Sequence, residues 1–367
     1  MQSVIHQFKD QILSAIAEQK VINIVGGNSK KWYGDKSKGE TLSTLDYKGI
    51  MDYQPEELVI TVCAGTPLKE VEAALASKNQ YFPFEPPHFG DNATIGGMVA
   101  AGLAGPGRGQ YGGLRDYVLG TKIMDGKGDV LSFGGKVMKN VAGYDVSRLM
   151  PGSLGTLALL LEVSIKVLPK PVRTETLKFQ MTDKDAIFQM NSWASQPLPL
   201  SASAWIGENN QGELWIRLSG ANAGVEAAIS KLQQQFPSEV VDSLESSIFW
   251  ESLREQTHSF FSDSSQALWR FSVNPLSDQF MGKEKVLIEW NGGQRWFKGN
   301  ISHEEAQKMA LKHQGHATLF KFSNDSSKSV FTPLSENPLT APLEIVQQRV
   351  RQTFDPHGLF KTGRMPY

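Results

Sequence analysis

The chain has 367 residues with a formal net charge of -1, and 40% of its residues are hydrophobic. These values are typical of a globular protein of about two domains, and the balanced charge excludes the basic surface that binds nucleic acid. Cys63 is the only cysteine. The chain can therefore form no internal disulfide and cannot supply the thiolates of an iron–sulfur cluster, which would have to belong to another polypeptide.

The most hydrophobic stretch is "LGTLALLLEVSIKVL" at 154–168. It is too short to cross a bilayer and contains Glu162 and Lys166, so we expect a buried strand. The N-terminus lacks the basic, apolar and small-residue order of a signal peptide. Together these features predict a cytoplasmic protein without a transmembrane segment.

The first third of the chain alternates helix and strand signals. Apolar residues at helical spacing predict an amphipathic helix over 4–16, and "VINIV" at 21–25 and "ELVITVCAG" at 57–65 predict strands. Thr66 is the expected N-cap of the next helix, with Pro67 at its first position. This alternation favours an α/β arrangement at the start of the chain.

Glycine and proline are concentrated in the segment 83–113. Regular structure cannot use so many of them, so we expect irregular backbone folded against another part of the molecule or a ligand. Strand signals return at 116–126 and 129–135, and the turn "DGKGD" between them predicts a hairpin.

A different pattern follows the "PKP" at 169–171. Strand-like stretches are separated by helical patterns at 183–195 and 225–236, which predicts an antiparallel sheet with helices on one face. "NGG" at 291–293 predicts a hairpin turn. A last helical pattern at 343–354 precedes the tail "DPHGLFKTGRMPY".

One motif resembles a dinucleotide site but lacks its context. "GRGQYG" at 107–112 fits the pattern G-x-G-x-x-G, which needs a strand before the glycines and a helix after them. Here more glycines precede the motif, and "LRDYVLG" after it is expected to continue as strand. We therefore reject a nicotinamide site at this position.

"IVGGNSKKWYG" at 24–34 is a better candidate for phosphate binding. A strand leads Gly26 and Gly27 into a tight turn, where successive backbone N–H groups can form an anion-binding nest. Ser29 would add a hydroxyl donor and Lys30 a nearby charge. The alternative is an ordinary turn between a strand and a helix.

Two further tracts strengthen the ligand interpretation. "NATIGGMVAAGLAGPGR" at 92–108 has Thr94 as a donor and small residues that let the backbone follow an extended ligand, although a helix packed tightly on a sheet would explain its alanines. In "KNVAGYDVSRL" at 139–149, Lys139 and Asp145 lie among small apolar residues. Asp145 and Arg148 could pair with each other, or polar groups of this tract could adjust a bound redox ring. The joint occurrence of three such tracts favours a cofactor.

In this order and spacing the tracts resemble the FAD-binding domain of the vanillyl-alcohol oxidase and p-cresol methylhydroxylase (PCMH) flavoproteins, and more closely the E subunits of bacterial glycolate oxidases. The similarity covers nearly all of residues 20–170 and the last dozen residues. It implies an α+β fold with a two-subdomain PCMH-type FAD-binding domain at 1–170. An antiparallel sheet with helices would form a substrate or cap-like domain at 171–341, and a C-terminal helix and tail at 342–367 would return to the FAD domain.

The resemblance also implies three sets of FAD contacts. One set lies on the pyrophosphate, the second passes under it toward the isoalloxazine, and the third lies beside the flavin. In chain order they are Gly26, Gly27, Asn28, Ser29 and Lys30; Thr94, Ile95, Gly96, Gly97, Gly102, Ala104 and Gly105; and Asn140, Val141, Ala142, Gly143 and Asp145. Some members of the family attach FAD through a His or Cys, but His88 does not match such a tether, so we expect noncovalent FAD.

The catalytic residues are not evident from the sequence. Related dehydrogenases, including the family's D subunit, carry a motif His-x-Gly-Asp-Gly-Asn that this chain lacks. Arg270 and Arg295 are candidates for holding a carboxylate, with stacking on Trp269 or Trp296 as the alternative. His316 is the candidate histidine, although "HQGHATLF" also fits a helix end that leads into a strand, and we expect no metal site there.

The resemblance implies the FAD-binding subunit of a complex that oxidises glycolate to glyoxylate, next to a catalytic D-type flavoprotein and an iron–sulfur subunit. The chain would relay electrons or support assembly, and any contact with the inner membrane would be made through the complex. Two alternatives stay open. The chain could be a self-sufficient FAD-dependent D-2-hydroxy-acid dehydrogenase, or a structural subunit without flavin.

Overall fold

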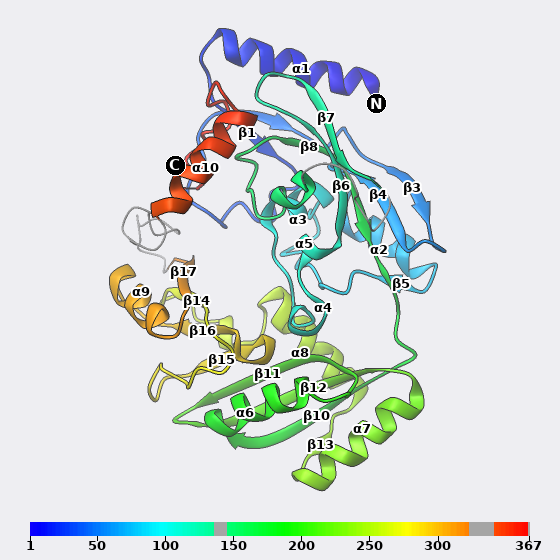
Figure 1. Ribbon diagram of the computed structural model, residues 1–367, viewed down its shortest axis with the longest axis vertical. Helices are drawn as coiled ribbons and strands as arrows, with labels where there is room; N and C mark the ends of the chain where they lie inside the picture. The colour runs from blue at the N-terminus through cyan, green and yellow to red at the C-terminus, as the bar shows by residue number, and fades with distance from the viewer. Residues whose placement is uncertain (136–144, 323–340, 366–367) are drawn as a thin grey trace.

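The computed structural model describes residues 1–135, 145–322 and 341–365. The N-terminal part forms the upper half of Figure 1, with α1 at the top, and the sheet that begins at β10 lies below it. The upper part combines the parallel pair β1–β2 with an antiparallel sheet in the order β3-β4-β8-β6-β7. Its elements are α1 (Gln2–Ala17), β1 (Ile22–Val25), β2 (Glu40–Ser43), β3 (Ile50–Gln54), β4 (Val59–Cys63), α2 (Leu68–Ala76), β5 (Gln80–Tyr81), α3 (Ile95–Ala101), α4 (Arg108–Tyr111), α5 (Leu114–Tyr117), β6 (Val118–Met124), β7 (Val130–Gly134), η1 (Val146–Leu149), β8 (Leu159–Lys166) and β9 (Leu168–Pro169).

The lower part is an antiparallel sheet in the order β13-β10-β12-β11-β15-β16-β14-β17. The predicted α+β class is therefore confirmed, and so is the antiparallel second half. The elements of this part are β10 (Arg173–Thr182), α6 (Asp183–Ala194), β11 (Leu200–Glu208), β12 (Gln211–Gly220), α7 (Asn222–Gln235), β13 (Glu239–Val240), α8 (Ser243–Glu255), η2 (Ser259–Phe261), β14 (Leu268–Ser272), β15 (Val286–Glu289), η3 (Trp290–Gly292), β16 (Gln294–Lys298), α9 (His303–Lys312) and β17 (His316–Lys321).

The predicted α/β arrangement of the first third is wrong in its strand directions. Within the described ranges, β1–β2 is the only parallel pair, and β3, β4, β6, β7 and β8 all pair antiparallel. The helix α2 leads to the short strand β5, which pairs with β9, and does not return the chain to a parallel neighbour of β4. The predicted hairpin of β6 and β7 is confirmed.

Two helix starts show how the local sequence sets the ends of these elements. α2 begins one residue later than expected, with Pro67 as its N-cap, because the Thr66 hydroxyl is engaged by Gly49 and by the Cys63 carbonyl. In α3 the Thr94 side chain accepts a hydrogen bond from the Gly97 N–H at 3.2 Å, which satisfies one of the unpaired donors of the first turn. Gly102, at a φ of 62°, ends that helix in the left-handed conformation.

The lower sheet buries both of its faces. One face packs against α6, α7 and α9 around a large apolar core. The opposite face packs against α8 and against residues of the upper part, among them Tyr33, Ala101 and Leu103. The "NGG" hairpin is confirmed, since β15 and β16 pair across a turn in which Asn291 has a φ of 57°. The two parts thus share an apolar interface.

Polar contacts also join the two parts. The Glu255 carboxylate of α8 accepts hydrogen bonds from the backbone N–H groups of His88 and Phe89. Arg217 of β12 forms an ion pair with Glu85 at 2.7 Å, and the Trp290 indole donates to the Gly105 carbonyl at 3.1 Å. These buried links fix the lower sheet against the glycine-rich segment that follows β5.

The C-terminal helix α10 (Ala341–Phe354) lies beside the upper part in Figure 1, near β1. The tail continues along that part, where the Leu359 carbonyl accepts from the Ile22 N–H at 2.7 Å. The Asp355 carboxylate accepts from the backbone N–H groups of Leu359 and Phe360, both at 2.8 Å, and so holds the turn that directs the tail.

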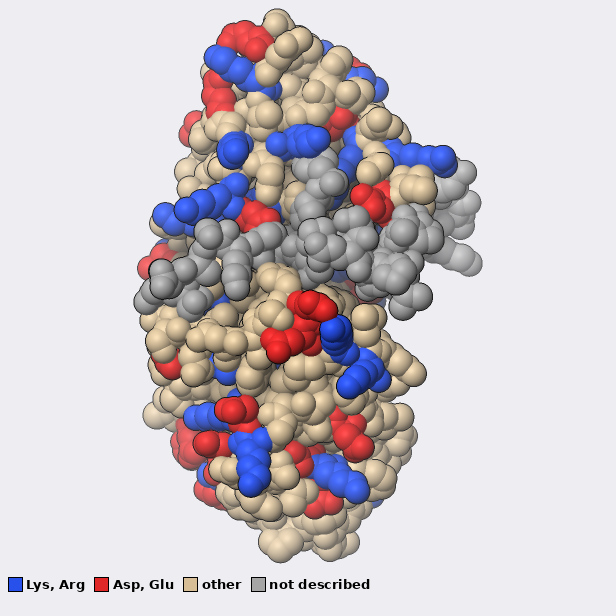
Figure 2. Space-filling model, turned by 90° about the vertical axis from the view of Figure 1, so that its left-hand side faces the viewer, with Lys and Arg blue, Asp and Glu red and all other residues tan. Residues whose placement is uncertain are grey.

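Two surface properties bear on partners. In the described ranges, no helix has the length and apolar character needed to cross a membrane. Figure 2 shows Lys, Arg, Asp and Glu side chains interspersed over the described part of one face, without a large field of one sign.

Candidate cofactor site

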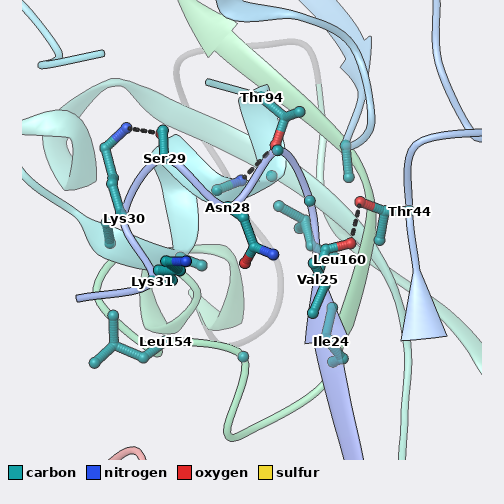
Figure 3. Close-up of a pocket in the computed structure, with 18 of the residues that line it drawn as sticks. Ile24, Val25, Asn28, Ser29, Lys30, Lys31, Thr44, Thr94, Leu154 and Leu160 are labelled. Carbon is teal, nitrogen blue, oxygen red and sulfur yellow. Dashed lines mark hydrogen bonds between the residues drawn. The ribbon is translucent and has the colours of Figure 1, made fainter. Parts of the chain in front are cut away.

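A pocket opens in the upper part where the loop after β1 meets the start of α3 (Figure 3). The empty space between its lining atoms amounts to about 750 Å³, part of which is open to solvent. Its wall is formed by residues from several segments that are distant in sequence. They are Ile24, Val25, Gly26, Gly27, Asn28, Ser29, Lys30, Lys31, Thr44, Ala64, Thr94, Gly96, Gly97, Ala100, Ala101, Leu154, Gly155, Ala158, Leu160 and Arg364.

The loop after β1 has the geometry of an anion nest. Asn28 has a φ of 59°, a left-handed residue between residues of ordinary conformation, which turns successive N–H groups toward one side. Among the described residues, none accepts a hydrogen bond from the backbone N–H groups of 27–30. In Figure 3 the Asn28 side chain extends into the space that Lys31, Leu154 and Leu160 frame. The loop can therefore offer several donors to a bound anion.

Lys30 adds a charge at the edge of this loop. Its side chain is buried, and its ammonium donates to the Ser29 hydroxyl at 3.3 Å and to the His88 carbonyl at 3.1 Å. Burial lowers the pKa of Lys30 to about 8, and the negative charge of Glu255 partly opposes that shift. Lys30 is therefore mostly protonated at neutral pH, and a bound anion would stabilise that charge further.

The glycines of the two loops are required by close backbone packing. A Cβ at Gly27 would lie 1.4 Å from the Asn92 carbonyl oxygen, and one at Gly96 would lie 2.9 Å from the Ala64 Cβ. The loop after β1 thus packs on the segment that precedes α3, and the start of α3 packs on Ala64 after β4, in both places with no room for a side chain. This packing accounts for the glycines as a structural feature, and it also exposes backbone along the floor of the pocket.

Arg364 of the C-terminal tail closes one side of the pocket, and the sequence interpretation missed it. Its Nη2 donates to the Lys30 carbonyl at 2.8 Å and its Nε to the Tyr33 carbonyl at 3.2 Å. The Asp35 N–H donates back to the Arg364 carbonyl at 3.0 Å. Burial lowers the pKa of Arg364 from its ordinary value, but an arginine stays charged at neutral pH. The sequence feature that could have pointed to Arg364 is the tail motif "KTGR" at 361–364.

The apolar wall was also missed. Ala100 and Ala101 belong to α3, and Leu154, Ala158 and Leu160 come from the hydrophobic run that was expected to be a buried strand. Leu154 has a φ of 50°, so its side chain is carried by a left-handed turn that precedes β8. A run of apolar residues does not reveal which of them face a cavity. The pocket therefore combines an anion-binding floor with an apolar wall.

The remaining residues of the predicted FAD sets lie elsewhere. Ile95 is buried in the core, and Gly102 packs against the backbone of Gly152. Ala104 and Gly105 line a smaller cavity between the two parts. Asn140, Val141, Ala142 and Gly143 lie outside the described residues, as does Lys139. Asp145 pairs with Arg148 at 2.9 Å, at the surface and not in the core, so the structure gives it that simpler role.

The three catalytic candidates are separated by the sheet. Arg295 of β16 is fully buried, and its guanidinium donates to the carbonyls of Gly292, Asp278 and Ser277 and lies over the Phe280 ring. Its donors are thus engaged by the backbone, and the ring beneath it is not a tryptophan. A role as carboxylate clamp is not supported by this geometry.

Arg270 of β14 lies on the opposite face and stacks on Phe320, with 5.2 Å from its guanidinium to the ring centroid. His316 starts β17 and pairs with Ser272, two residue pairs from Arg270 and on the same face. Burial and the charge of Arg270 lower the pKa of His316 from its ordinary value. As expected, α9 ends before His316 and β17 begins with it. Among the residues that the structure describes, no group of three or more His, Cys, Asp or Glu side chains is placed to hold a metal ion.

The pocket fits a ligand with a phosphate arm and an apolar ring system, because its donors gather on the loop after β1 and its apolar wall faces them. A comparison with known families agrees, since residues 9–134 match the model "FAD binding domain". Alkyldihydroxyacetonephosphate synthase has a similar fold, with a TM-score of 0.65 at 15% identity over 96% of this chain and 74% of that one. The fold and the match define a protein with a FAD-binding domain.

Sequence comparison narrows this class further. The glycolate oxidase subunit GlcE of Escherichia coli is 42% identical over 356 residues, which cover 97% of this chain and 95% of that protein. The glycolate oxidase subunit GlcD of Bacillus subtilis is 33% identical over 182 residues, 49% of this chain and 38% of that protein. A D-lactate dehydrogenase of Archaeoglobus fulgidus is 32% identical over 170 residues, 44% of this chain and 38% of that protein. The chain belongs to the GlcE family of FAD-binding proteins.

Proposed function

We propose that this chain is the FAD-binding subunit of a glycolate oxidase complex that converts glycolate to glyoxylate. The observation that carries the proposal is the pocket of the upper part, where an anion nest, Lys30 and an apolar wall meet in a chain similar to GlcE over nearly its whole length. A bound FAD would supply an acceptor for the two electrons that leave a 2-hydroxy acid on its oxidation.

The residues of the pocket would hold FAD in the following way. The N–H groups of 27–30 and the Lys30 ammonium would bind the pyrophosphate, and Thr94 and Gly97 would line its other side. Leu154 and Leu160 would cover an apolar part of the ligand. Among the described residues that line the pocket there is no histidine or cysteine, the residue types that tether flavins, which supports noncovalent FAD.

The proposed partners are a catalytic D-type flavoprotein and an iron–sulfur subunit. The similarity to GlcD spans about half of this chain and little more than a third of that protein, so the GlcD-like part supports a shared cofactor fold and not a shared active site. The single cysteine supports placing a cluster on another polypeptide. Within the complex, this chain would relay electrons or support assembly, at the inner membrane only through its partners.

The second candidate is a self-sufficient FAD-dependent D-2-hydroxy-acid dehydrogenase. One observation favours it, namely that the Arg270 guanidinium lies between the two parts without a carboxylate partner among the described residues. A histidine motif of the dehydrogenase type is missing from the sequence, which favours the subunit role instead. A structural subunit without flavin is disfavoured by the donors that the pocket leaves unused.

Two measurements separate these candidates. After reconstitution with FAD, the purified chain should show flavin absorption bands that survive gel filtration, and their absence would favour the structural subunit. Glycolate or D-lactate is then added under anaerobic conditions. The proposal predicts little bleaching of the chain alone and rapid bleaching once a D-type subunit is present. Rapid bleaching of the isolated chain would favour the self-sufficient enzyme.

A further inference from the structure

Glu255 is the last residue of α8 in the lower part, and its carboxylate contacts a turn of the upper part. It accepts hydrogen bonds from the backbone N–H of His88, at 3.1 Å to each oxygen, and from that of Phe89 at 2.8 Å. The helix dipole disfavours an acid in the last turn, where cations are preferred. The contact with the turn at 88–89, rather than the helix, thus accounts for an acid at this position.

The backbone of this turn has a conformation that needs support. Phe89 has a φ of 51°, in the left-handed region that residues with a bulky side chain seldom adopt. Such a residue stays in that region only where its surroundings determine the conformation. The Glu255 side chain is 16% exposed and accepts from both N–H groups of the turn, so it supplies this constraint through charge-assisted hydrogen bonds.

The same turn holds the cation of the pocket shown in Figure 3. The Lys30 ammonium donates to the His88 carbonyl at 3.1 Å and lies over the Phe89 ring, 5.7 Å from its centroid. Two of the groups that hold the ammonium thus belong to the residues whose N–H groups Glu255 binds. A series of contacts therefore runs from α8 through the turn to Lys30, which lines the pocket.

Glu255 also acts on Lys30 through its charge. Burial lowers the pKa of Lys30 to about 8, and the negative charge of Glu255 opposes that shift. A carboxylate near an ammonium stabilises its protonated form. Glu255 therefore helps Lys30 to keep the positive charge that a bound pyrophosphate would meet.

We propose that Glu255 is a positioning residue of the cofactor site, which holds the turn at 88–89 and through it places the charged Lys30 for the pyrophosphate of FAD. This inference rests on the proposed function, because the cofactor is the one assigned there. The described residues that line the pocket come from the upper part and the C-terminal tail. Glu255 would give the lower part a share in cofactor affinity without lining the pocket.

Other charged or titratable groups surround Lys30 and the turn. They are Lys31, Glu72, His88, Arg254, Lys321 and Arg364. Arg254 pairs with Glu255 at 2.8 Å, and the His88 imidazole lies 2.9 Å from the Glu72 carboxylate. A change at Glu255 therefore also removes a partner of Arg254, which the test has to control.

Lys321 of β17 is the neighbour whose titration overlaps with that of Lys30. Its ammonium lies over the Phe89 ring at 5.6 Å from the centroid, and burial lowers its pKa to about 8 as well. A pH response of FAD binding must therefore be assigned by comparing proteins with and without Lys30.

The test is titration of the full-length apoprotein with FAD, followed by quenching of flavin fluorescence between pH 6.5 and pH 9.5. Glu255→Gln keeps an acceptor for the turn but removes the charge, so Lys30 should lose its proton at lower pH than in the unchanged protein. The decline in FAD affinity should begin at correspondingly lower pH. Binding should be roughly twofold weaker than in the unchanged protein at pH 8 and similar at pH 6.5.

Two comparisons assign this shift. Glu251→Gln is the matched control, because Glu251 is an α8 carboxylate that also pairs with Arg254, at 3.3 Å, while the N–H groups of the turn bind Glu255. Its pH profile should coincide with that of the unchanged protein. In the Lys30→Met background, Glu255→Gln should leave the profile where it is. In the apoprotein, NMR titration of ¹³C-labelled lysine should show the Lys30 signal, identified by its loss in Lys30→Met, shifted to lower pH by Glu255→Gln.

Three results would overturn the positioning role while FAD binding stays intact. They are coincident pH profiles of Glu255→Gln and the unchanged protein, an equal shift in Glu251→Gln, and a shift that persists in the Lys30→Met background. A Lys30 NMR titration that Glu255→Gln leaves unaltered would contradict the role without reference to FAD. Absence of saturable FAD binding in the unchanged protein is a different failure, since it would contradict the proposed cofactor site and, with it, this inference.

Discussion

Arg270 and Arg295 lie on neighbouring strands of the lower sheet, with their side chains on opposite faces. The hydrogen-bond partners of the two guanidinium groups differ. On the face covered by α6, α7 and α9, Arg295 is held by three backbone carbonyls inside an apolar core. On the face toward the upper part, Arg270 has an unpartnered Nε beside a cavity. The first arrangement is structural, and the second leaves binding capacity unused.

The largest effect is expected on the face where backbone carbonyls hold the Arg295 guanidinium. Arg295→Met should lower the free energy of unfolding by about 3 kcal/mol, because three buried carbonyls lose their donors. Arg270→Met should change it by less than about 1 kcal/mol, since little of its hydrogen bonding is satisfied. Urea unfolding followed by tryptophan fluorescence gives both values. Equal losses for the two variants would remove the contrast between the faces.

Glu289 should make the cavity face sensitive to pH. Its folded-state pKa of about 7 lies above the ordinary value of 4.5, so the folded state binds the proton more tightly and stability falls as pH rises from about 4.5 to 7. The buried carboxyl can account for a loss of up to about 3 kcal/mol over this window. Glu289→Gln should be more stable than the unchanged protein at pH 8 and similar at pH 4.5, measured by urea unfolding at each pH. A variant less stable at pH 8 would contradict this account.

Lys30 should give the pocket of the upper part a pH response of its own. Its folded-state pKa is lowered to about 8, so its charge is lost as pH rises through that value, and FAD affinity should fall by about tenfold between pH 7 and pH 9. Quenching of flavin fluorescence on titration measures this affinity. Lys30→Met should bind FAD more weakly at pH 7 and show a flatter profile, whereas Lys38→Met, at an exposed lysine that does not line the pocket, serves as the control. A profile that stays steep in Lys30→Met assigns the response to another group.

Arg364 holds backbone as Arg295 does and also lies beside a cavity as Arg270 does. It donates to two backbone carbonyls and lines the pocket of the upper part. Arg364→Met should release the loop after β1 and weaken FAD binding by roughly fivefold, the smallest of these effects, with little change in the stability of the lower sheet. Arg364→Lys should restore only part of the affinity, because a lysine cannot donate to two carbonyls in the same fork geometry. Unchanged affinity in Arg364→Met would make the tail a packing element only.

The fold was predicted well where local chemistry decides it. The β6–β7 hairpin and the "NGG" turn follow from residues that favour tight turns. The strand directions of the first third were not predictable. An alternation of strand and helix signals does not determine which neighbouring strand each strand pairs with. Thr66 was misassigned as a cap since its hydroxyl bonds depend on Gly49, distant in sequence.

The candidate site was predictable in part for the same reason. The loop at 26–30 and the start of α3 are local motifs, whereas Arg364 reaches the pocket from a tail more than 300 residues away. Arg270 and Arg295 looked alike because both lie among aromatic residues. Only the register that pairs Arg270 with Trp296 and Phe271 with Arg295 shows that they face opposite sides. Glu255 carried no motif at all, and its role depends on the packing of the two parts.

The central claim is that the pocket beside Gly27 and Lys30 holds FAD without a covalent bond. Its most direct test is titration of the purified apoprotein with FAD, followed by acid precipitation of the loaded chain. The account predicts saturable binding of one FAD per chain, weakened in Lys30→Met, with all flavin released into the supernatant. Absence of saturable binding, or flavin that stays with the precipitated protein, would contradict it.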